Sequence, residues 1–441
     1  MMKKKITNFM SRKTMVVIGA AIMTGYIANC AVAKKAADSA AASIAATATN
    51  VYNSTTSRGD LVSYTITGSD VTLDWNVTDA TGVIQFTANI AATCGAQDAT
   101  YGYRTCTISS ATCTAGAVAC PAGTAPSGTF EVMEIPGTAV IVHVPAAVAS
   151  AAEGATTTRE ELHAGFISGG CPADVSGDYA YIKVARASMT SSATDLFGMY
   201  RTDATFTNVH HSEFGMTTTG AISAAISDYM TNAANLSGAE ILTGSTCNNG
   251  VFTRSASGNT LRINATAGGT FILDLPAGQG GLISFKTTNA AAIGDLASRN
   301  WWGIVFPDAG APDLVSLTSS TLASNQVTVS GSTLSGGTIT NVPVQPASDA
   351  ALATKFTAPT AYTTSGNALQ TTYAAPANIP GLMQISQGPD NNIVAIASKV
   401  GSQVMLFGTV YNLRSAAGAT CTAGTAGCIP RNAGNFMLFS H

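Results

Sequence analysis

The sequence predicts an all-β protein, an antiparallel β-sandwich or barrel that is stapled by disulfides and carries one or two short helices. Three observations support this class. Short segments rich in Thr, Val, Ile and aromatic residues alternate between apolar and polar positions, turn-forming Gly, Asn and Pro separate them, and eight cysteines follow Cys30. The chain has 441 residues, which is enough for two domains.

The first predicted strands lie at 61–67, 71–77 and 83–87, where polar and apolar side chains alternate and Gly-containing turns intervene. Two more, at 130–135 and 139–144, are joined through a Pro-Gly pair that favours a tight turn. This order of short strands and short turns predicts an antiparallel meander.

Further strands are predicted in a second block, at 179–185, 196–200, 251–254, 261–264, 271–275 and 282–285. Only residues 221–236 show a helical period of apolar side chains. The apolar runs 393–397 and 404–410, with Gly401 between them, predict a hairpin near the end of the chain.

Composition changes along the chain suggest where its parts begin and end. We expect a leader at 1–29, an Ala/Ser/Thr-rich tether at 30–56 and an N-terminal β domain at 57–145 with a cysteine-rich loop over 94–128. Residues 145–164 are expected to form a linker or short helix. A larger β domain follows at 165–441, with a Pro/Ala/Thr-rich surface excursion at 345–379.

Charge is scarce, at 10% of residues, whereas 46% are hydrophobic and the mean hydropathy is +0.24. A disordered chain would have the opposite balance. Beyond the N-terminus, apolar runs are too short for membrane helices. No basic cluster follows Lys35, so nucleic acid is not an expected partner.

The N-terminus carries Lys3, Lys4, Lys5, Arg12 and Lys13, followed by a mostly apolar stretch over 14–27. At 1.5 Å per residue this stretch spans roughly 21 Å, shorter than a bilayer core of about 30 Å. A secretory signal peptide is therefore predicted instead of a membrane span.

Two cleavage sites are consistent with this leader. Residues 27–30, Ile-Ala-Asn-Cys, resemble the lipobox of bacterial lipoproteins, although Asn29 stands where Gly, Ala or Ser is usual. The resemblance implies that Cys30 is lipidated and anchors the chain in the outer membrane or at the cell surface. The alternative is cleavage after Ala33, within a small-x-small motif, giving a periplasmic or secreted protein.

The cysteines that remain after Cys30 are even in number, which in an exported chain favours disulfides. Eight cysteines allow 105 pairings, and spacing favours local ones. The predicted pairs are Cys94 with Cys106, Cys113 with Cys120, Cys421 with Cys428 and, by remainder, Cys171 with Cys247.

Two segments contain residue types that bind metals. His211 and Glu213 lie two residues apart and would share one face of a strand. Asp174, Ser176 and Asp178 alternate as at the start of a Ca²⁺ loop, but the later Gly and Glu positions of an EF-hand are missing, and a β-turn is the alternative. No cofactor is predicted.

The other candidates are an aromatic pair and two histidines. Trp301 and Trp302 could provide a stacking surface for a sugar, although adjacent strand residues face opposite ways and one is expected in the core. His143 is expected on a solvent face or in a structural hydrogen bond, and His163 on an exposed helix face. No catalytic residue is assigned, because the hydrolase and phosphate-loop motifs are missing.

These observations predict an exported, lipid-anchored envelope or cell-surface β-protein with a non-catalytic structural, adhesive or ligand-binding role. Its partners would be the membrane, through the lipid on Cys30, and an unidentified protein or glycan. A secreted or periplasmic hydrolase acting on glycan or peptide is one alternative, for which acidic pairs such as Glu131 and Glu134 could serve. A surface-array or filament subunit is another.

Overall fold

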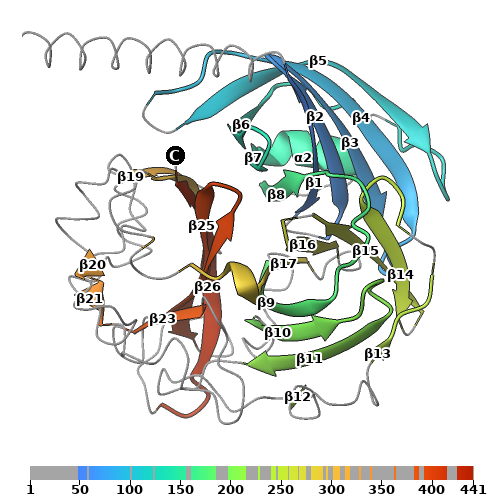
Figure 1. Ribbon diagram of the computed structural model, residues 1–441. Coiled ribbons are helices and arrows are strands. Elements are labelled where there is room, and N and C mark those ends of the chain that lie inside the picture. The colour runs from blue at the N-terminus through green and yellow to red at the C-terminus, as the bar shows by residue number, and fades with distance from the viewer. Residues whose placement is uncertain are drawn as a thin grey trace, which may run out of the picture. The chain divides into compact units, whose positions relative to one another are not determined.

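In the computed structural model the fold lies within residues 50–441 of the chain (Figure 1). The leader and most of the tether, including Cys30, lie outside the described residues. The described residues are 48–56, 59–99, 102–122, 125–154, 160–184, 197–214, 227–228, 240–244, 247–256, 258–266, 268–274, 280–291, 295, 301–307, 313–317, 327–328, 338–339, 362–363, 382–386, 392–414 and 425–440.

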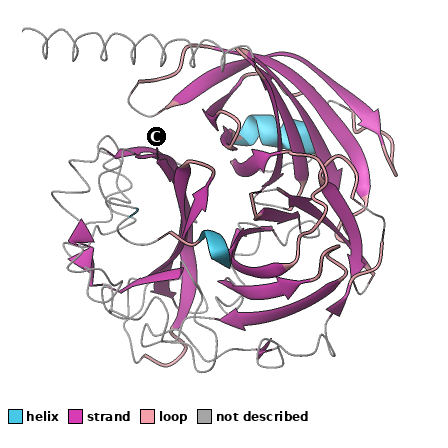
Figure 2. Cartoon of the chain, in the orientation of Figure 1, coloured by secondary structure: helices cyan, strands magenta, loops and turns pink. Residues whose placement is uncertain are grey.

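The fold is antiparallel β almost throughout its described part, as predicted (Figure 2). Its first element is a closed barrel in which each strand pairs with the next along the chain and the eighth pairs with the first. The barrel strands are β1 Thr49–Thr56, β2 Leu61–Thr67, β3 Asp70–Thr78, β4 Ile84–Cys94, β5 Tyr103–Ala115, β6 Thr129–Ile135, β7 Ala139–Val144 and β8 Glu161–Ile167.

Alternation along the barrel strands sends every second side chain inward. Tyr64 on β2 and Trp75 on β3 are fully buried in a core cluster with side chains from β1 and from β4 to β7. Helix α2, Ala146–Glu153, contributes Val148, Ala149 and Ala152 to this cluster. The helix prediction within 145–164 is therefore confirmed for residues 146–153.

A second sheet contains nine strands, in the order β12-β11-β10-β9-β17-β16-β15-β14, with β13 paired to β11. The bridge between Thr243 and Ser255 joins the segment after β13 to β14, so the sheet curls back on itself. Its strands are β9 Gly177–Val184, β10 Phe197–Thr202, β11 Asn208–Phe214, β12 Ser227–Asp228, β13 Glu240–Ile241, β14 Val251–Ala256, β15 Asn259–Ala265, β16 Thr270–Asp274 and β17 Gly281–Lys286.

A third sheet follows the 3₁₀ turn η2, Thr287–Asn289, in the order β19-β18-β26-β25-β24-β23-β22-β21-β20. The predicted hairpin is confirmed as β24 and β25, where Val400 pairs with Gln403. The strands are β18 Trp301–Pro307, β19 Asp313–Leu317, β20 Val327–Thr328, β21 Thr338–Ile339, β22 Tyr362–Thr363, β23 Leu382–Ser386, β24 Asn392–Val400, β25 Gln403–Arg414 and β26 Ile429–Ser440.

One hydrophobic cluster, which we call the shared core, joins the barrel to both sheets. It combines the outward faces of β6, β7 and β8 with one face of each sheet. Because these barrel strands are covered on both sides, nearly every residue of β7 and β8 is buried. Representative members are Phe166 from the barrel, Phe285 from the second sheet and Phe407 from the third.

The predicted domain boundaries need correction. Thr49–Thr56, assigned to the tether, forms β1 and closes the barrel against β8, and β8 itself crosses the predicted boundary at 165. The polar composition of β1 suggested an exposed tether. Asn53 is nevertheless buried, and its Nδ2 donates to Asn264 Oδ1 on β15 at 3.0 Å. Residues 50–441 form one compact unit instead of two domains.

Three local predictions also differ from the structure. The cysteine-rich loop is mostly β5, since Thr and Ile suit an exposed strand and Cys94 lies opposite Cys106 in the ladder with β4. Within the predicted helix 221–236, the described Ser227–Asp228 is strand β12, because it pairs with β11. Of the excursion 345–379, only Tyr362–Thr363 is described, and it forms β22.

The shared core is expected to carry a large part of the stability. Phe285 is 2% exposed and its ring meets that of Phe166 edge-on at 5.9 Å. We predict that Phe285→Ala lowers the free energy of unfolding by about 3 to 5 kcal/mol, measured by denaturant titration. Val51→Ala, at a 37% exposed site, is the control and should change it by less than about 0.5 kcal/mol.

Candidate functional site

In the predicted calcium-type segment 174–178, both aspartate side chains are bound to other groups of the protein. Asp174 is exposed, and its Oδ1 accepts the backbone N–H of Ser176 at 2.8 Å, a hydrogen bond that lowers the pKa of Asp174. Asp178 forms a two-point ion pair with Arg201, with Oδ1–Nε and Oδ2–Nη2 distances of 2.5 and 2.8 Å. The segment therefore consists of a local Asp174–Ser176 hydrogen bond followed by strand β9, which begins at Gly177.

His211 lies on β11 and is half-buried, and the neighbouring His210 is buried on the opposite face. Glu213 pairs with Gly198 in the ladder, but its side chain lies outside the described part. Across the described residues, no group of three or more His, Cys, Asp or Glu side chains is placed to hold a metal ion. The pairing of His211 with Glu213 stays a prediction.

Trp302 lies on β18 and is half-buried, with its ring packed against the shared core. The ring also covers the backbone of Gly102, where a Cβ would lie 2.2 Å from a ring carbon and where φ is +75°. One tryptophan of the pair thus packs as core, and the side chain of Trp301 lies outside the described residues. The predicted stacking surface is not formed by Trp302.

The cysteine pairing inferred from spacing is confirmed for three bridges: Cys94–Cys106, Cys113–Cys120 and Cys171–Cys247. Cys428 is also disulfide-bonded, whereas Cys421 lies outside the described residues. These bonds indicate folding in an oxidising environment, as found outside the cytoplasm. No helix in the described part is long and apolar enough to span a membrane.

The barrel interior holds a polar network that the sequence did not reveal. His163 on β8 is fully buried, not on an exposed helix face as predicted, and its Nδ1 shares a hydrogen bond with the Tyr64 hydroxyl. The Trp75 ring stands at right angles to the imidazole of His163, and the two ring centroids are 4.5 Å apart. Burial, aided by the charge of His143, lowers the pKa of His163 to about 3, so this imidazole is neutral.

A buried carboxylate extends the network to the β1–β2 turn. Asp60 Oδ2 accepts the Trp75 indole N–H at 3.1 Å, and Oδ1 accepts both the N–H and the hydroxyl of Thr78 at 2.9 Å. Thr56 Oγ1 in turn accepts the N–H of Asp60. These bonds satisfy polar groups that would be costly to bury unpaired, and they fix the register at this end of the barrel.

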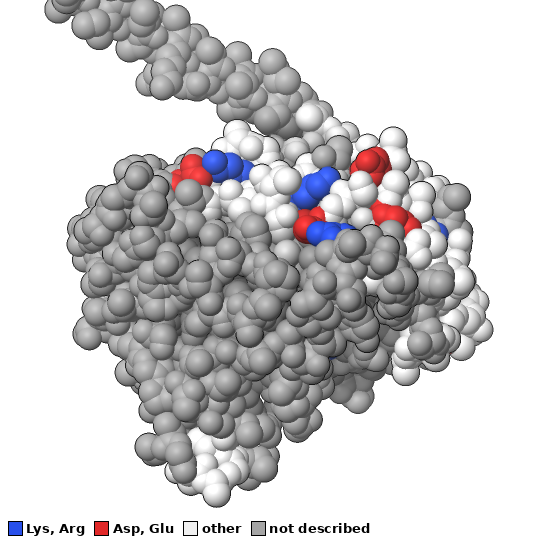
Figure 3. Space-filling view, turned by 60° about the horizontal axis from the view of Figure 1, so that its bottom comes forward, with Lys and Arg blue, Asp and Glu red and all other residues white. Residues whose placement is uncertain are grey.

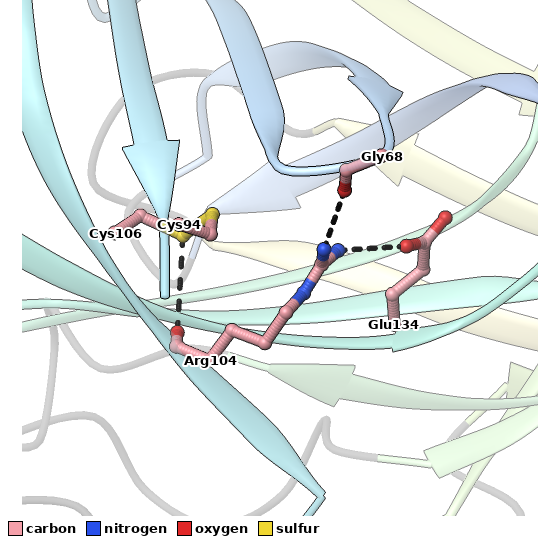
Figure 4. Close-up of a disulfide and its surroundings, with 5 residues drawn as sticks. All are labelled: Gly68, Cys94, Arg104, Cys106 and Glu134. Atoms are coloured by element: carbon pink, nitrogen blue, oxygen red, sulfur yellow. Dashed lines mark hydrogen bonds and ion pairs between the residues drawn. A yellow bond between two sulfur atoms is a disulfide. The ribbon is translucent and has the colours of Figure 1, made fainter. Parts of the chain in front are cut away.

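A second inward network lies beside the Cys94–Cys106 bridge (Figure 4). The Arg104 guanidinium donates to Gly68 O at 2.6 Å and pairs with Glu134 Oε2 at 2.9 Å. Glu134 Oε1 accepts the Tyr52 hydroxyl at 2.8 Å. Burial and the adjacent Glu134 raise the pKa of Tyr52, which keeps the phenol protonated.

On the outer face, His143 lies between two carboxylates. Its Nδ1 bonds Glu131 and its Nε2 lies 3.2 Å from Glu160 Oε2, so both ring nitrogens are occupied. This is the structural hydrogen bonding predicted for His143. Because Glu131 faces outward and Glu134 inward, the two do not form a glycosidase pair.

The burial of His163 was not predicted from the sequence, because the neighbouring Glu160 and Glu161 indicated an exposed helix. The available clue was the run 162–167, Leu-His-Ala-Gly-Phe-Ile, whose apolar residues suit a buried strand. No family model, curated protein or solved structure matches this chain. Its function is therefore argued from these side chains.

The buried His163 should make stability fall in acid. The unfolded chain binds a proton near pH 6.5 and the folded chain only near pH 3, so stability is complete above about pH 6.5 and is lost progressively down to about pH 3. We predict a loss of roughly 1 kcal/mol per pH unit in this window. Denaturant titrations between pH 7 and 4 would measure it.

His163→Gln should flatten this dependence, because Gln does not titrate. Tyr64→Phe is the matched control, since it removes the same hydrogen bond but retains the imidazole and should retain the slope. Equal slopes for the wild type and His163→Gln would contradict the assignment.

The longest disulfide loop should stabilise most. Cys171 and Cys247 are 76 residues apart, whereas Cys113 and Cys120 are 7 apart. Replacing both cysteines of a pair by Ser should cost about 4 kcal/mol for the first bridge and about 2 kcal/mol for the second, from loop entropy. Melting curves of the two variants would rank them, and the reverse order would contradict the entropic account.

Proposed function

We propose that this protein is exported to the bacterial envelope, where it is anchored through a lipid on Cys30 and plays a non-catalytic structural, adhesive or ligand-binding role. The main support is that side chains capable of acid–base chemistry form hydrogen bonds and ion pairs within the fold. His143 and Glu134, which would be natural acids and bases, are occupied by structural partners, and His163 is buried with its Nδ1 bonded to Tyr64 and its Nε2 closed to solvent.

The character of the surface supports this role. In the view of Figure 3, acidic and basic side chains lie close to one another, and the rest of the described surface is uncharged. Strand β5 is typical, with Thr, Ser and Ala exposed along most of its length. Hydroxyl groups without charge suit a protein that meets other surfaces, because their desolvation is less costly than that of ions.

The disulfides support the location. The paired cysteines Cys94, Cys106, Cys113, Cys120, Cys171 and Cys247 would be reduced in the cytoplasm. Removing residues 1–29 takes away five basic and no acidic residues, so 21 basic residues become 16 against 24 acidic ones, a net charge of -8. This acidic balance is consistent with an anchor made by covalent lipid and not by attraction to anionic headgroups.

The anchor is tested by expressing the full chain in a bacterial host, fractionating the cells and measuring the intact mass of the product. We expect a membrane-associated protein that begins at Cys30 with a diacylglyceryl adduct. Cys30→Ser is the control and should be neither lipidated nor retained by the membrane. A mature chain beginning at Lys34 would overturn the anchor, and retention of the full-length chain in the cytoplasm would overturn export.

The non-catalytic role has a separate test. The purified protein, with its disulfides intact, is incubated with cell-wall glycan and with an unfolded polypeptide, and products are followed by mass spectrometry. No products are expected. Reproducible turnover of either substrate would instead support the hydrolase alternative.

A further inference from the structure

The turn from Asn248 to Val251 contains the only Asn-Gly pair of the chain, Asn249-Gly250. The backbones of Asn248 and Val251 exchange two N–H···O bonds, each 2.9 Å long. Both residues between them have positive φ, +48° at Asn249 and +82° at Gly250. These features define a type I′ hairpin turn, for which Asn-Gly is the preferred pair, and the turn leads directly into β14.

An Asn-Gly pair is also prone to deamidation. Gly has no side chain to obstruct an attack by its own backbone nitrogen on the carboxamide of the preceding Asn. The Asn249 side chain is exposed, and among the described residues no hydrogen bond holds its amide. The group that would be attacked is therefore accessible.

The attacking nitrogen, by contrast, is held in place. Gly250 is buried, and its N–H donates to Cys171 Sγ at 3.4 Å. The Asn249 carbonyl accepts the Ser168 hydroxyl at 3.3 Å, and the Gly250 carbonyl accepts the Ala265 N–H at 3.3 Å. These bonds fix the peptide on both sides of the nitrogen, so in the closed turn it neither loses its proton to solvent nor rotates toward the Asn249 side chain.

The Cys171–Cys247 disulfide maintains this arrangement. It positions the sulfur that accepts the Gly250 N–H, and Cys247 immediately precedes the turn. Among the three bridges formed between described residues, it alone includes an exposed cysteine, Cys171. A thiol reductant would therefore reach this bridge most readily.

We propose that Asn249 is a deamidation site that the Cys171–Cys247 bridge keeps closed. When the bridge is lost, the Gly250 nitrogen gives up its proton and bonds to Cγ of Asn249, while the side-chain nitrogen takes up a proton and leaves as ammonia. Water then opens the resulting succinimide. Cleavage of the new N–Cγ bond gives aspartate, and cleavage of the original peptide bond gives isoaspartate, whose main chain runs through Cγ.

Both products change the turn. Each adds a carboxylate, and isoaspartate also lengthens the main chain, which a two-residue turn does not accommodate. Gly250 lies against Asn264, which pairs with Val251 in the ladder and bonds Asn53 of the barrel. Deamidation would therefore loosen this contact and permanently mark chains that have lost the bridge. The inference goes beyond the proposed role and does not depend on the lipid anchor.

Peptide mass mapping of the purified protein tests the proposal. The wild type with its disulfides intact and the variant Cys171→Ser/Cys247→Ser are incubated at mildly alkaline pH. The peptide containing Asn249 is followed for a mass increase of one dalton and for isoaspartate. The variant should deamidate at least about tenfold faster, because the reaction requires an open turn. Equal rates, or a wild type that reacts as fast as its reduced form in urea, would overturn the proposal.

Two further variants serve as controls. Cys113→Ser/Cys120→Ser removes a different bridge and leaves the Gly250 contact in place, so it should react at the wild-type rate. If it reacts as fast as Cys171→Ser/Cys247→Ser, general loss of stability controls the reaction and the proposal fails. Asn249→Gln cannot form a succinimide and should abolish the mass change. A change that persists would lie at Asn248 and contradict the assignment.

A milder variant keeps the test decisive if Cys171→Ser/Cys247→Ser unfolds, which circular dichroism would reveal. Ser168→Ala retains the bridge and removes only the hydrogen bond to the Asn249 carbonyl. It should raise the deamidation rate at least about twofold, as expected from the loss of one hydrogen bond that holds the turn. A wild-type rate in Ser168→Ala would then show that these contacts do not restrain the peptide, and the proposal would fail.

Discussion

The shared core is the constraint on which the rest of the structure depends. Three strands of a closed barrel would normally turn polar side chains outward, but the outer faces of β6, β7 and β8 carry Met133, Ile141, Leu162 and Phe166, which need cover. The second and third sheets supply it. Burying one cluster between three sheets joins the barrel and both sheets in one unit, residues 50–441.

The buried polar groups follow from the same packing. The barrel interior is filled by side chains and is dominated by Trp75 and the tyrosines of β1 and β2, so His163 and Asp60 must find partners inside it. They are bound to Tyr64, Trp75 and Thr78 and are closed to solvent. Such a network specifies strand register more than it adds stability.

The sequence predicted the elements whose signals are local. The hairpins at 130–144 and 393–410 follow alternation and turn residues. The Cys94–Cys106 and Cys113–Cys120 bridges follow spacing, because short loops close easily, and Cys171–Cys247 follows by remainder. The sequence failed where burial is decided by distant strands. The polar strand β1 is buried because β8 and β15 cover it, and His163 lies inside because β8 closes the barrel. The long β5 was mistaken for a loop because both its faces are polar.

The amino-acid sequence by itself determined the β class, the two local disulfides Cys94–Cys106 and Cys113–Cys120 and the low charge, since each depends on side-chain type and on short separations along the chain. Only the tertiary structure decided that eight strands close into a barrel, that the barrel and two sheets share one core, and that β5 runs on past the end of its pairing with β6 at Thr107. These outcomes depend on pairings between residues far apart in the sequence, which no local pattern encodes.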